Sequence, residues 1–139
     1  MTITPLPNKQ IDYIWNKVKG YFEICADTTN GRYTANDLRT MIKTRDKQLW
    51  ISHEDEEIYG FAITSLLDYP QMRVLMMNFT GGREFHKWHK PIMDTFREFA
   101  KNNGCEELEA HGRAGWTKVF KDEGYSKMND VFRMPVEIE

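Results

Sequence analysis

The stretch from Gly81 to Lys90 holds the densest set of residues whose types suggest binding chemistry. Gly81 and Gly82 precede Arg83, and the next seven residues add four more basic or potentially basic side chains: His86, Lys87, His89 and Lys90. Glycines let an anion approach the backbone closely, and basic side chains supply positive charge. The stretch can therefore form an anion-binding turn. Alternatively, the glycines only turn the chain and the basic residues form a solvated face.

A second arginine, Arg113, lies in the segment His111 to Trp116, which reads H-G-R-A-G-W. Arg83 and Arg113 each follow a predicted strand, and the two strands are expected to be neighbours. Their guanidinium groups would then converge near the ends of those strands, where they would suit a phosphate or a carboxylate. The alternative is that each arginine pairs with a local acid, such as Glu84 or Glu109.

Metal and disulfide chemistry find little support in the residue spacing. His86, His89 and His111 could lie near one another, but there is no H-E-x-x-H motif, and we expect no metal. Cys25 and Cys105 lack the paired spacing of a zinc site and are too few for a disulfide framework. They are expected to be free thiols in a reducing compartment.

Composition favours a single soluble domain spanning residues 1–139. The chain is 40% hydrophobic and 29% charged, so it can bury a core, and its formal net charge is −2. That charge gives no global attraction to nucleic acid or to an anionic membrane. No apolar run approaches the roughly 18 residues that span a bilayer. The N-terminus does not resemble a secretion signal, so we expect a cytoplasmic location.

Hydrophobic periodicity predicts an α/β domain with a mixed sheet. Helical spacing of apolar residues predicts helices that begin near Asn8, after an N-cap at Thr34, near Lys90 and near Gly115. Alternating or continuous apolar runs predict six strands: residues 2–6, 48–53, 58–67, 71–80, 106–111 and 127–138. The order is therefore β-α-α-β-β-β-α-β-α-β. Turns join the middle strands into an antiparallel meander, and a later crossover requires a parallel pair.

This order resembles that of the GNAT acetyltransferase superfamily over nearly the whole chain. The similarity is greatest in residues 71–125. There a buried strand is followed by a helix ending in F-A-K-N-N-G-C, a strand, and a short helix ending in F-K-D-E-G-Y. The resemblance implies a sheet whose two central strands splay apart.

The resemblance also implies a function, the transfer of an acetyl group from acetyl-CoA to an amine that the sequence does not identify. Acetyl-CoA would lie between the splayed strands, with its thioester carbonyl polarised by backbone N–H groups around Met77, Asn78 and Phe79. Phosphate groups would bind at the residues Gly81, Gly82, Arg83 and Arg113. Glu109 or His111 would act as the base that deprotonates the amine.

Three positions depart from the pattern of the family. The glycines of the family's phosphate-binding turn align with Lys87 and His89. Many members use a tyrosine to protonate the departing thiolate, and Phe120 occupies that position. The family's asparagine is replaced by Arg113. Phe120 has no proton to donate, which leaves Tyr125 and Tyr59 as candidate proton donors.

The G-R-x-G-W segment resembles a phage-encoded group of GNAT-like proteins, which also tend to carry G-R and a tryptophan where Gly82, Arg83 and Trp88 stand. This suggests an alternative function, a catalytically inactive module that binds a virion or host protein. Trp88 and Trp116 would then be exposed interface anchors. For a phage protein, the location would be the host cytoplasm or the virion.

Overall fold

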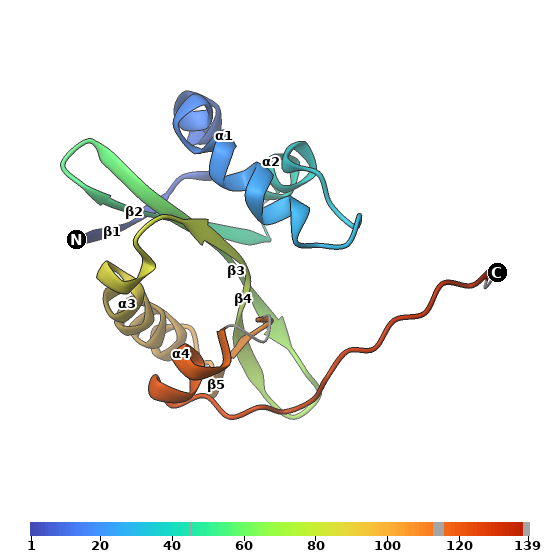
Figure 1. Ribbon diagram of the computed structural model, residues 1–139. Coiled ribbons are helices and arrows are strands. Elements are labelled where there is room, and N and C mark those ends of the chain that lie inside the picture. The colour runs from blue at the N-terminus through green and yellow to red at the C-terminus, as the bar shows by residue number, and fades with distance from the viewer. Residues whose placement is uncertain (45, 113–115, 138–139) are drawn as a thin grey trace.

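The computed structural model describes residues 1–44, 46–112 and 116–137. Within these residues, five strands form one sheet in the order β1-β2-β3-β4-β5 (Figure 1). The strands are β1 (Thr2–Leu6), β2 (Lys47–Glu54), β3 (Glu57–Asp68), β4 (Arg73–Gly82) and β5 (Glu107–Ala110). Neighbours from β1 to β4 pair antiparallel, and β5 pairs parallel with β4. The mixed sheet predicted from the sequence is therefore confirmed.

Helices cover both faces of this sheet. One 3-10 turn, η1 (Asn8–Gln10), leads into α1 (Ile11–Asp27), which lies with α2 (Ala35–Lys43) on one face. A second 3-10 turn, η2 (Phe85–Lys87), precedes α3 (His89–Asn102), which shares the other face with α4 (Thr117–Asp122) (Figure 1). None of the described helices has the length and apolar character that a bilayer span requires.

The start of α2 follows the sequence prediction. The Thr34 hydroxyl accepts a hydrogen bond from the Asp37 N–H at 3.1 Å, and the Asp37 carboxylate accepts one from the Thr34 N–H at 2.8 Å. This reciprocal pair is a capping box, which satisfies two backbone donors at once. The predicted N-cap at Thr34 is confirmed.

Two apolar clusters hold the layers together. On the side of α1 and α2, the buried ring of Phe22 packs on Phe61 of β3, with their centroids 4.0 Å apart. On the side of α3, the buried Phe96 packs edge-on against Trp50 of β2, with the centroids at 5.4 Å. The sheet is thus buried on both faces, which explains the continuous apolar run in the centre of β4.

The predicted last strand, Lys127–Ile138, is not observed. In the described part of this range, residues 127–137 form neither strand nor helix, and Ile138 lies outside the described residues. After α4 the chain leaves the body of the domain and runs away from β5, the strand with which it could pair (Figure 1). A strand needs a partner for its backbone hydrogen bonds, and among the described residues no strand pairs with residues 127–137.

Phe22→Ala should lower the free energy of unfolding by about 3–5 kcal/mol, because it empties a fully buried site between α1 and the sheet. The matched control is Tyr13→Ala on the same helix, whose side chain is 87% exposed. That change should alter stability by less than about 0.5 kcal/mol. Urea denaturation followed by circular dichroism measures both. Equal losses for the two variants would contradict the described packing of α1.

Candidate functional site

Strands β4 and β5 separate after four paired residues. Pairing runs from Val74 beside Glu107 to Met77 beside Ala110, where β5 ends while β4 continues to Gly82. From Asn78 onward, the β4 edge on this side has no strand partner within the described chain. Free N–H and C=O groups along a strand edge are a template for another extended chain or ligand. The divergence matches the splayed central strands expected from the sequence.

Asn78 is an extra residue in β4. Ile63 of β3 pairs with Phe79, and the next residue, Thr64, pairs with Met77, so Asn78 has no residue opposite it. Such a β-bulge bends its strand and increases the local twist. It lies at the residue where β4 loses its pairing with β5, so the bulge and the divergence coincide.

The bulge also exchanges the faces of the flanking side chains. Met77 packs in the cluster beneath α3, whereas Phe79 lies on the opposite face and contacts Tyr33 edge-on, with centroids 5.2 Å apart. The Asn78 side-chain oxygen accepts a hydrogen bond of 2.8 Å from the hydroxyl of Ser65, which is buried. This polar contact fixes the bulged residue in place.

Glu109 lies on the sheet face opposite α3. It stands beside Met76, which in turn pairs with Ser65, whereas its neighbours Leu108 and Ala110 pack in the cluster under α3. The Tyr69 hydroxyl donates a 2.9 Å hydrogen bond to the Glu109 carboxylate. This hydrogen bond raises the pKa of Tyr69 above its ordinary value, with smaller effects from burial and from the charge of Glu109. Glu109 thus shares one face with the Ser65–Asn78 pair.

His111, the other predicted base, follows the end of β5 and is exposed. Because it lies outside the paired part of the strand, its side chain is not held by the β4–β5 register. The structure therefore distinguishes the two candidates, with Glu109 positioned by a hydrogen bond and His111 facing solvent. Arg113 lies outside the described residues.

Gly81 and Gly82 lie within β4, not in an open turn. Gly82 pairs with Gly60 of β3, and a Cβ atom on Gly60 would lie 2.5 Å from the carbonyl oxygen of Gly81. A Cβ on Gly82, whose φ is +145°, would collide with the carbonyl of Tyr59. The glycines are thus required for a close approach of β3 and β4, which is a different role from the displaced phosphate turn suggested by the sequence.

The Trp88 side chain covers the close approach of β3 and β4 at Gly60. Its ring would lie 2.5 Å from a Cβ on Gly60, and only 1% of the residue is exposed. Its indole N–H donates a 2.9 Å hydrogen bond to the carbonyl of Arg83. The prediction that Trp88 is an exposed interface anchor is therefore wrong. The indole fills the space beside Gly60 and is buried in the core. Trp116 is half-buried.

Arg83 is occupied by partners within the chain. Its N–H donates to the carbonyl of Tyr59 at 2.8 Å, and its guanidinium pairs with Glu57, Glu84 and the Tyr21 hydroxyl. The guanidinium also stacks on the Tyr59 ring at 4.1 Å. The hydrogen bonds to Glu57 and Tyr21 raise the pKa of Arg83 above its ordinary value. The alternative prediction, that Arg83 pairs with Glu84, is confirmed.

The other basic residues of this stretch fall into two groups. Lys87 pairs with Glu84 at 3.0 Å, and His89 Nδ1 lies 3.0 Å from a carboxylate oxygen of Glu123. Lys87 lowers the pKa of Glu84, and the charge of Arg83 adds to the effect. Two side chains are exposed and have no acidic partner within ion-pair distance in the described chain: His86 and Lys90. They are the members of the stretch best placed to meet an anion.

The start of α3 adds positive potential beside Lys90. The N-cap residue, Trp88, makes no side-chain capping bond, and the first turn contains no acidic residue. The first N–H groups of a helix lack intrahelical acceptors and carry about half a positive charge together. Pro91 at the third position is compatible with this first turn. Helix α3 begins at His89, about one residue before the start predicted near Lys90.

Aromatic rings connect α4 to this region. Phe85 contacts Trp116 at 4.6 Å, Trp116 stacks on Phe120 at 5.8 Å, and Phe120 contacts Tyr125 at 5.1 Å. The Tyr125 hydroxyl donates to the sulfur of Met93 in α3 at 3.5 Å. Burial raises the pKa of Tyr125 to about 12, so its hydroxyl stays protonated at neutral pH.

Sequence reasoning missed three residues of this site. Tyr69, Ser65 and Glu57 hold Glu109, Asn78 and Arg83 respectively. Their separations along the chain run from 13 to 40 residues. No motif marks such distant pairs, and only the strand register brings them together.

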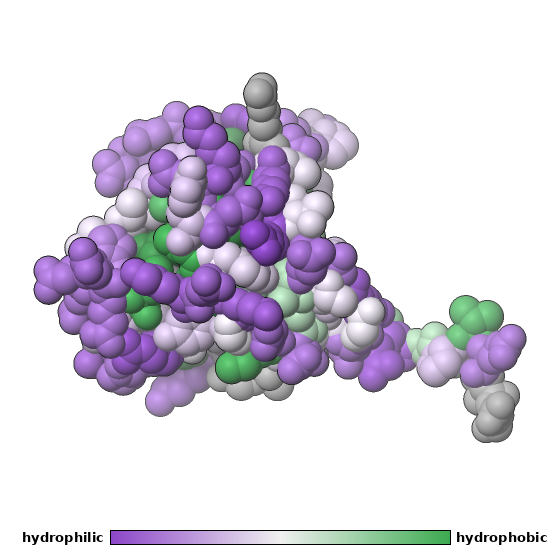
Figure 2. Space-filling model, turned by 90° about the horizontal axis from the view of Figure 1, so that it is seen from above, coloured by the Kyte–Doolittle hydropathy of each residue, from purple (hydrophilic) through white to green (hydrophobic). Residues whose placement is uncertain are grey.

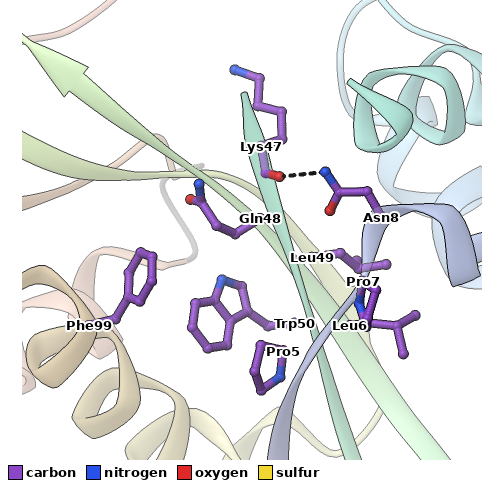
Figure 3. Close-up of a pocket in the computed structure, with 9 residues that line it drawn as sticks. All are labelled: Pro5, Leu6, Pro7, Asn8, Lys47, Gln48, Leu49, Trp50 and Phe99. Atoms are coloured by element: carbon purple, nitrogen blue, oxygen red, sulfur yellow. Dashed lines mark hydrogen bonds between the residues drawn. The ribbon is translucent and has the colours of Figure 1, made fainter. Parts of the chain in front are cut away.

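A shallow pocket of about 330 Å³ lies elsewhere, between β1, β2 and the end of α3 (Figure 3). Trp50 and Phe99 both line it and contact each other edge-on, with centroids 5.1 Å apart. β1 is the edge of the sheet opposite β5. A second pocket of about 310 Å³ lies between the β1–β2 pair and α1. Neither pocket is lined by a predicted site residue.

Comparison with solved structures shows the fold. The chain is similar to a ribosomal-protein-alanine N-acetyltransferase from Brucella melitensis biovar Abortus 2308, with a TM-score of 0.72, 12% identity, and coverage of 97% of this chain and 99% of that one. It is similar to an aminoglycoside N-acetyltransferase solved with CoA, with a TM-score of 0.67, 16% identity, and coverage of 99% and 95%.

A third similar structure is an aminoglycoside acetyltransferase from an uncultured soil metagenomic sample, solved with sisomicin. The TM-score is 0.70, the identity 11%, and the coverage 99% of this chain and 96% of that one. No protein-family model matches the chain, and a search of curated proteins finds no relative. The chain therefore has the GNAT acetyltransferase fold, and at these identities the likeness concerns the fold alone.

Gly60→Ala should destabilise the protein by about 1–3 kcal/mol, because the added methyl group meets the Gly81 carbonyl and the Trp88 ring. Gly20→Ala in α1 is the matched control, since nothing lies within 4 Å of its added methyl group. That change should stabilise the helix by about 0.5–1 kcal/mol. Thermal and urea unfolding measure both variants. A neutral Gly60→Ala would contradict the close approach of β3, β4 and Trp88.

Proposed function

We propose that the protein transfers an acetyl group from acetyl-CoA to an amine. The observation that carries this proposal is the divergence of β4 from β5 at the Asn78 bulge, which leaves a free strand edge in the centre of the domain. The fold supports it, since proteins of this fold include acetyltransferases, one of them solved with CoA. The acceptor amine is left open.

Two parts of the described chain suit acetyl-CoA. The β4 edge from Asn78 onward offers N–H and C=O groups that an extended chain of amides can pair with. At the start of α3, the helix terminus and Lys90 offer positive charge to phosphate groups, and the exposed His86 offers a ring N–H as a hydrogen-bond donor. The glycines of the usual phosphate turn are absent, so the side chains carry more of this contact. When bound, acetyl-CoA supplies an acetyl group activated as a thioester.

The chain's own residues then have distinct roles. Backbone N–H groups at Asn78 and Phe79 polarise the thioester carbonyl. Glu109 accepts the proton of the attacking amine, and Tyr69 holds the Glu109 carboxylate in position through its 2.9 Å hydrogen bond. His111 is the second candidate base. Arg113, beyond the end of β5, is a further candidate for a phosphate contact.

Protonation of the departing thiolate needs a donor other than Phe120. Tyr125 packs against Phe120 and has a pKa of about 12, so it retains its proton at neutral pH. Its hydroxyl can donate a hydrogen bond to a thiolate if it leaves the Met93 sulfur. Tyr59 is less suited, because its ring is covered by the Arg83 guanidinium.

Titration calorimetry should detect acetyl-CoA binding with a Kd between about 1 µM and 1 mM. Lys90→Glu should weaken binding about fivefold, because it reverses the charge beside the start of α3. Lys101→Glu, which reverses an exposed charge in the last turn of the same helix, is the control and should leave Kd unchanged. Absence of binding at millimolar acetyl-CoA would refute the proposed function.

Glu109→Gln should lower kcat by about 10²–10⁴-fold while leaving the Kd of acetyl-CoA unchanged, because it removes the base and keeps the shape. Glu106→Gln, an exposed acid three residues earlier, is the control and should keep full activity. Release of free CoA thiol against a panel of amines provides the assay. Full activity in Glu109→Gln would transfer the role of base to His111.

A second candidate function is a non-catalytic protein-binding module. The observation that favours it is the pairing of Arg83, Lys87 and His89 with acidic side chains, which leaves few side chains free to contact phosphate groups. Of the two proposed anchors, Trp88 is buried and cannot serve, whereas Trp116 is half-buried. The acetyl-CoA titration separates this candidate from the enzyme.

A further inference from the structure

A hydrogen-bonded hydroxyl and imidazole connect β1 to β2 beside α1. Thr4 Oγ1 lies 2.6 Å from His53 Nε2, and His53 Nδ1 lies 3.0 Å from the backbone carbonyl oxygen of Asp55. A carbonyl oxygen can only accept a hydrogen bond, so in the neutral imidazole Nδ1 carries the hydrogen and Nε2 is the acceptor. The Thr4 hydroxyl is therefore the donor, and its hydrogen points at the imidazole.

This arrangement is the one that a hydroxyl nucleophile and its general base require. In such sites the base lies within hydrogen-bond distance of the hydroxyl, and a third group holds the base in the tautomer that the reaction needs. Here β1 supplies Thr4, β2 supplies His53, and the turn between β2 and β3 supplies the Asp55 carbonyl. Three segments of the chain thus converge on one hydroxyl.

The Thr4–His53 pair opens into a pocket that a small ligand can enter. Both side chains are half-buried and line the pocket of about 310 Å³ between the β1–β2 pair and α1. Its other walls are mainly apolar, from Leu6, Ile14, Ile51 and Ile58. Seen from the side of α1, the surface of the molecule is mostly hydrophilic, with small apolar areas between the polar side chains (Figure 2). A pocket of this size and lining suits a short apolar group.

The charges around the pocket favour a neutral ligand. Lys17 of α1 lines the pocket, is exposed and has no acidic partner within ion-pair distance in the described chain, whereas Lys19 pairs with Glu23. Its ammonium group can stabilise negative charge that develops on the oxygen of an attacked carbonyl. The exposed acids Asp55 and Glu56 also line the pocket, and they disfavour a ligand that is itself an anion.

We propose that Thr4 and His53 form a second catalytic site, which hydrolyses a neutral ester of a short apolar acid. The Thr4 oxygen attacks the carbonyl carbon of the ester, and His53 Nε2 takes the hydroxyl proton. The bond between that carbon and the alcohol oxygen breaks, and His53 returns the proton to the departing alcohol. The acyl group is then an ester of Thr4. This inference does not depend on acetyl transfer.

Water completes the reaction. His53 Nε2 takes a proton from a water molecule, whose oxygen attacks the carbonyl carbon of the acyl-threonine. The bond from that carbon to Thr4 Oγ1 breaks, and His53 gives the proton back to the Thr4 oxygen. The products are the free acid and the original hydroxyl, so that one water is consumed for each ester cleaved.

Incubation of the full chain with 4-nitrophenyl butyrate tests the proposal. The expected result is sustained release of 4-nitrophenol, together with a butyryl ester on Thr4 that peptide mass spectrometry locates after acid quenching. Butyryl groups on lysines alone, Lys17 included, would overturn the proposal, because they would show only the reaction of amines with an activated ester. Absence of any label on Thr4 would overturn it equally.

Two threonines of β1 provide matched variants. Thr4→Val removes the hydroxyl but keeps a β-branched side chain suited to a strand, and it should lower the rate of ester cleavage about 10²–10⁴-fold. Thr2→Val makes the same change at an exposed position of the same strand and should keep full activity. Equal activity of the two variants would mean that the Thr4–His53 hydrogen bond only joins β1 to β2.

His53→Gln examines the other half of the pair. It removes the base and should abolish both the release of 4-nitrophenol and the label on Thr4. Circular dichroism and urea unfolding of each variant separate loss of chemistry from loss of structure. The location of the label in the unchanged protein does not depend on the folding of any variant, so it decides the proposal even where a variant is unstable.

A retained label on Thr4 in His53→Gln would overturn the role of the imidazole as base.

Discussion

The extra residue at Asn78 is the constraint on which the centre of this structure depends. Because of this extra residue, Met77 faces α3 and Phe79, only two positions later, faces α1 and α2. Both apolar clusters therefore receive a side chain from the same short segment of β4. The extra residue also coincides with the loss of pairing to β5. Without the bulge, strict alternation would place Phe79 on the same face as Met77, and one core would lose a ring. The free strand edge thus begins at the residue that allows both cores to be filled.

Patterns confined to a few consecutive residues predicted most of the fold. The N-cap at Thr34, the short apolar run in β2 and the longer apolar run in β4 each depend on neighbours along the chain. The contacts of Trp88 could not be predicted in this way. Its burial depends on Gly60, which lies 28 positions earlier and is placed beneath the indole only by the β3–β4 register. The hydrogen bond of Tyr69 to Glu109 is set by register in the same way.

The prediction of a last strand over residues 127–138 failed for the opposite reason. Its apolar residues are visible in the sequence, but a strand exists only where a partner edge meets it, and the pattern does not say which edge that is. In the candidate site, the residue types showed which side chains carry charge, but not which of them are free to bind a ligand. Arg83 was recognisable as a cation, whereas its neutralisation by Glu57 depends on a residue 26 positions away. Positive charge near the start of α3 is therefore smaller than its count of basic residues suggests.

Strand β1 has a consequence for how the chain folds. Its residues are synthesised before those of β2, with which they pair, so that Thr2 meets His53 and Leu6 meets Leu49. During synthesis β1 must wait until more than forty further residues have left the ribosome before its partner is available. The β2, β3 and β4 strands are joined by short turns and can pair at a much lower cost of loop closure. Strand β1 is thus expected to enter the sheet after β2, β3 and β4 have paired.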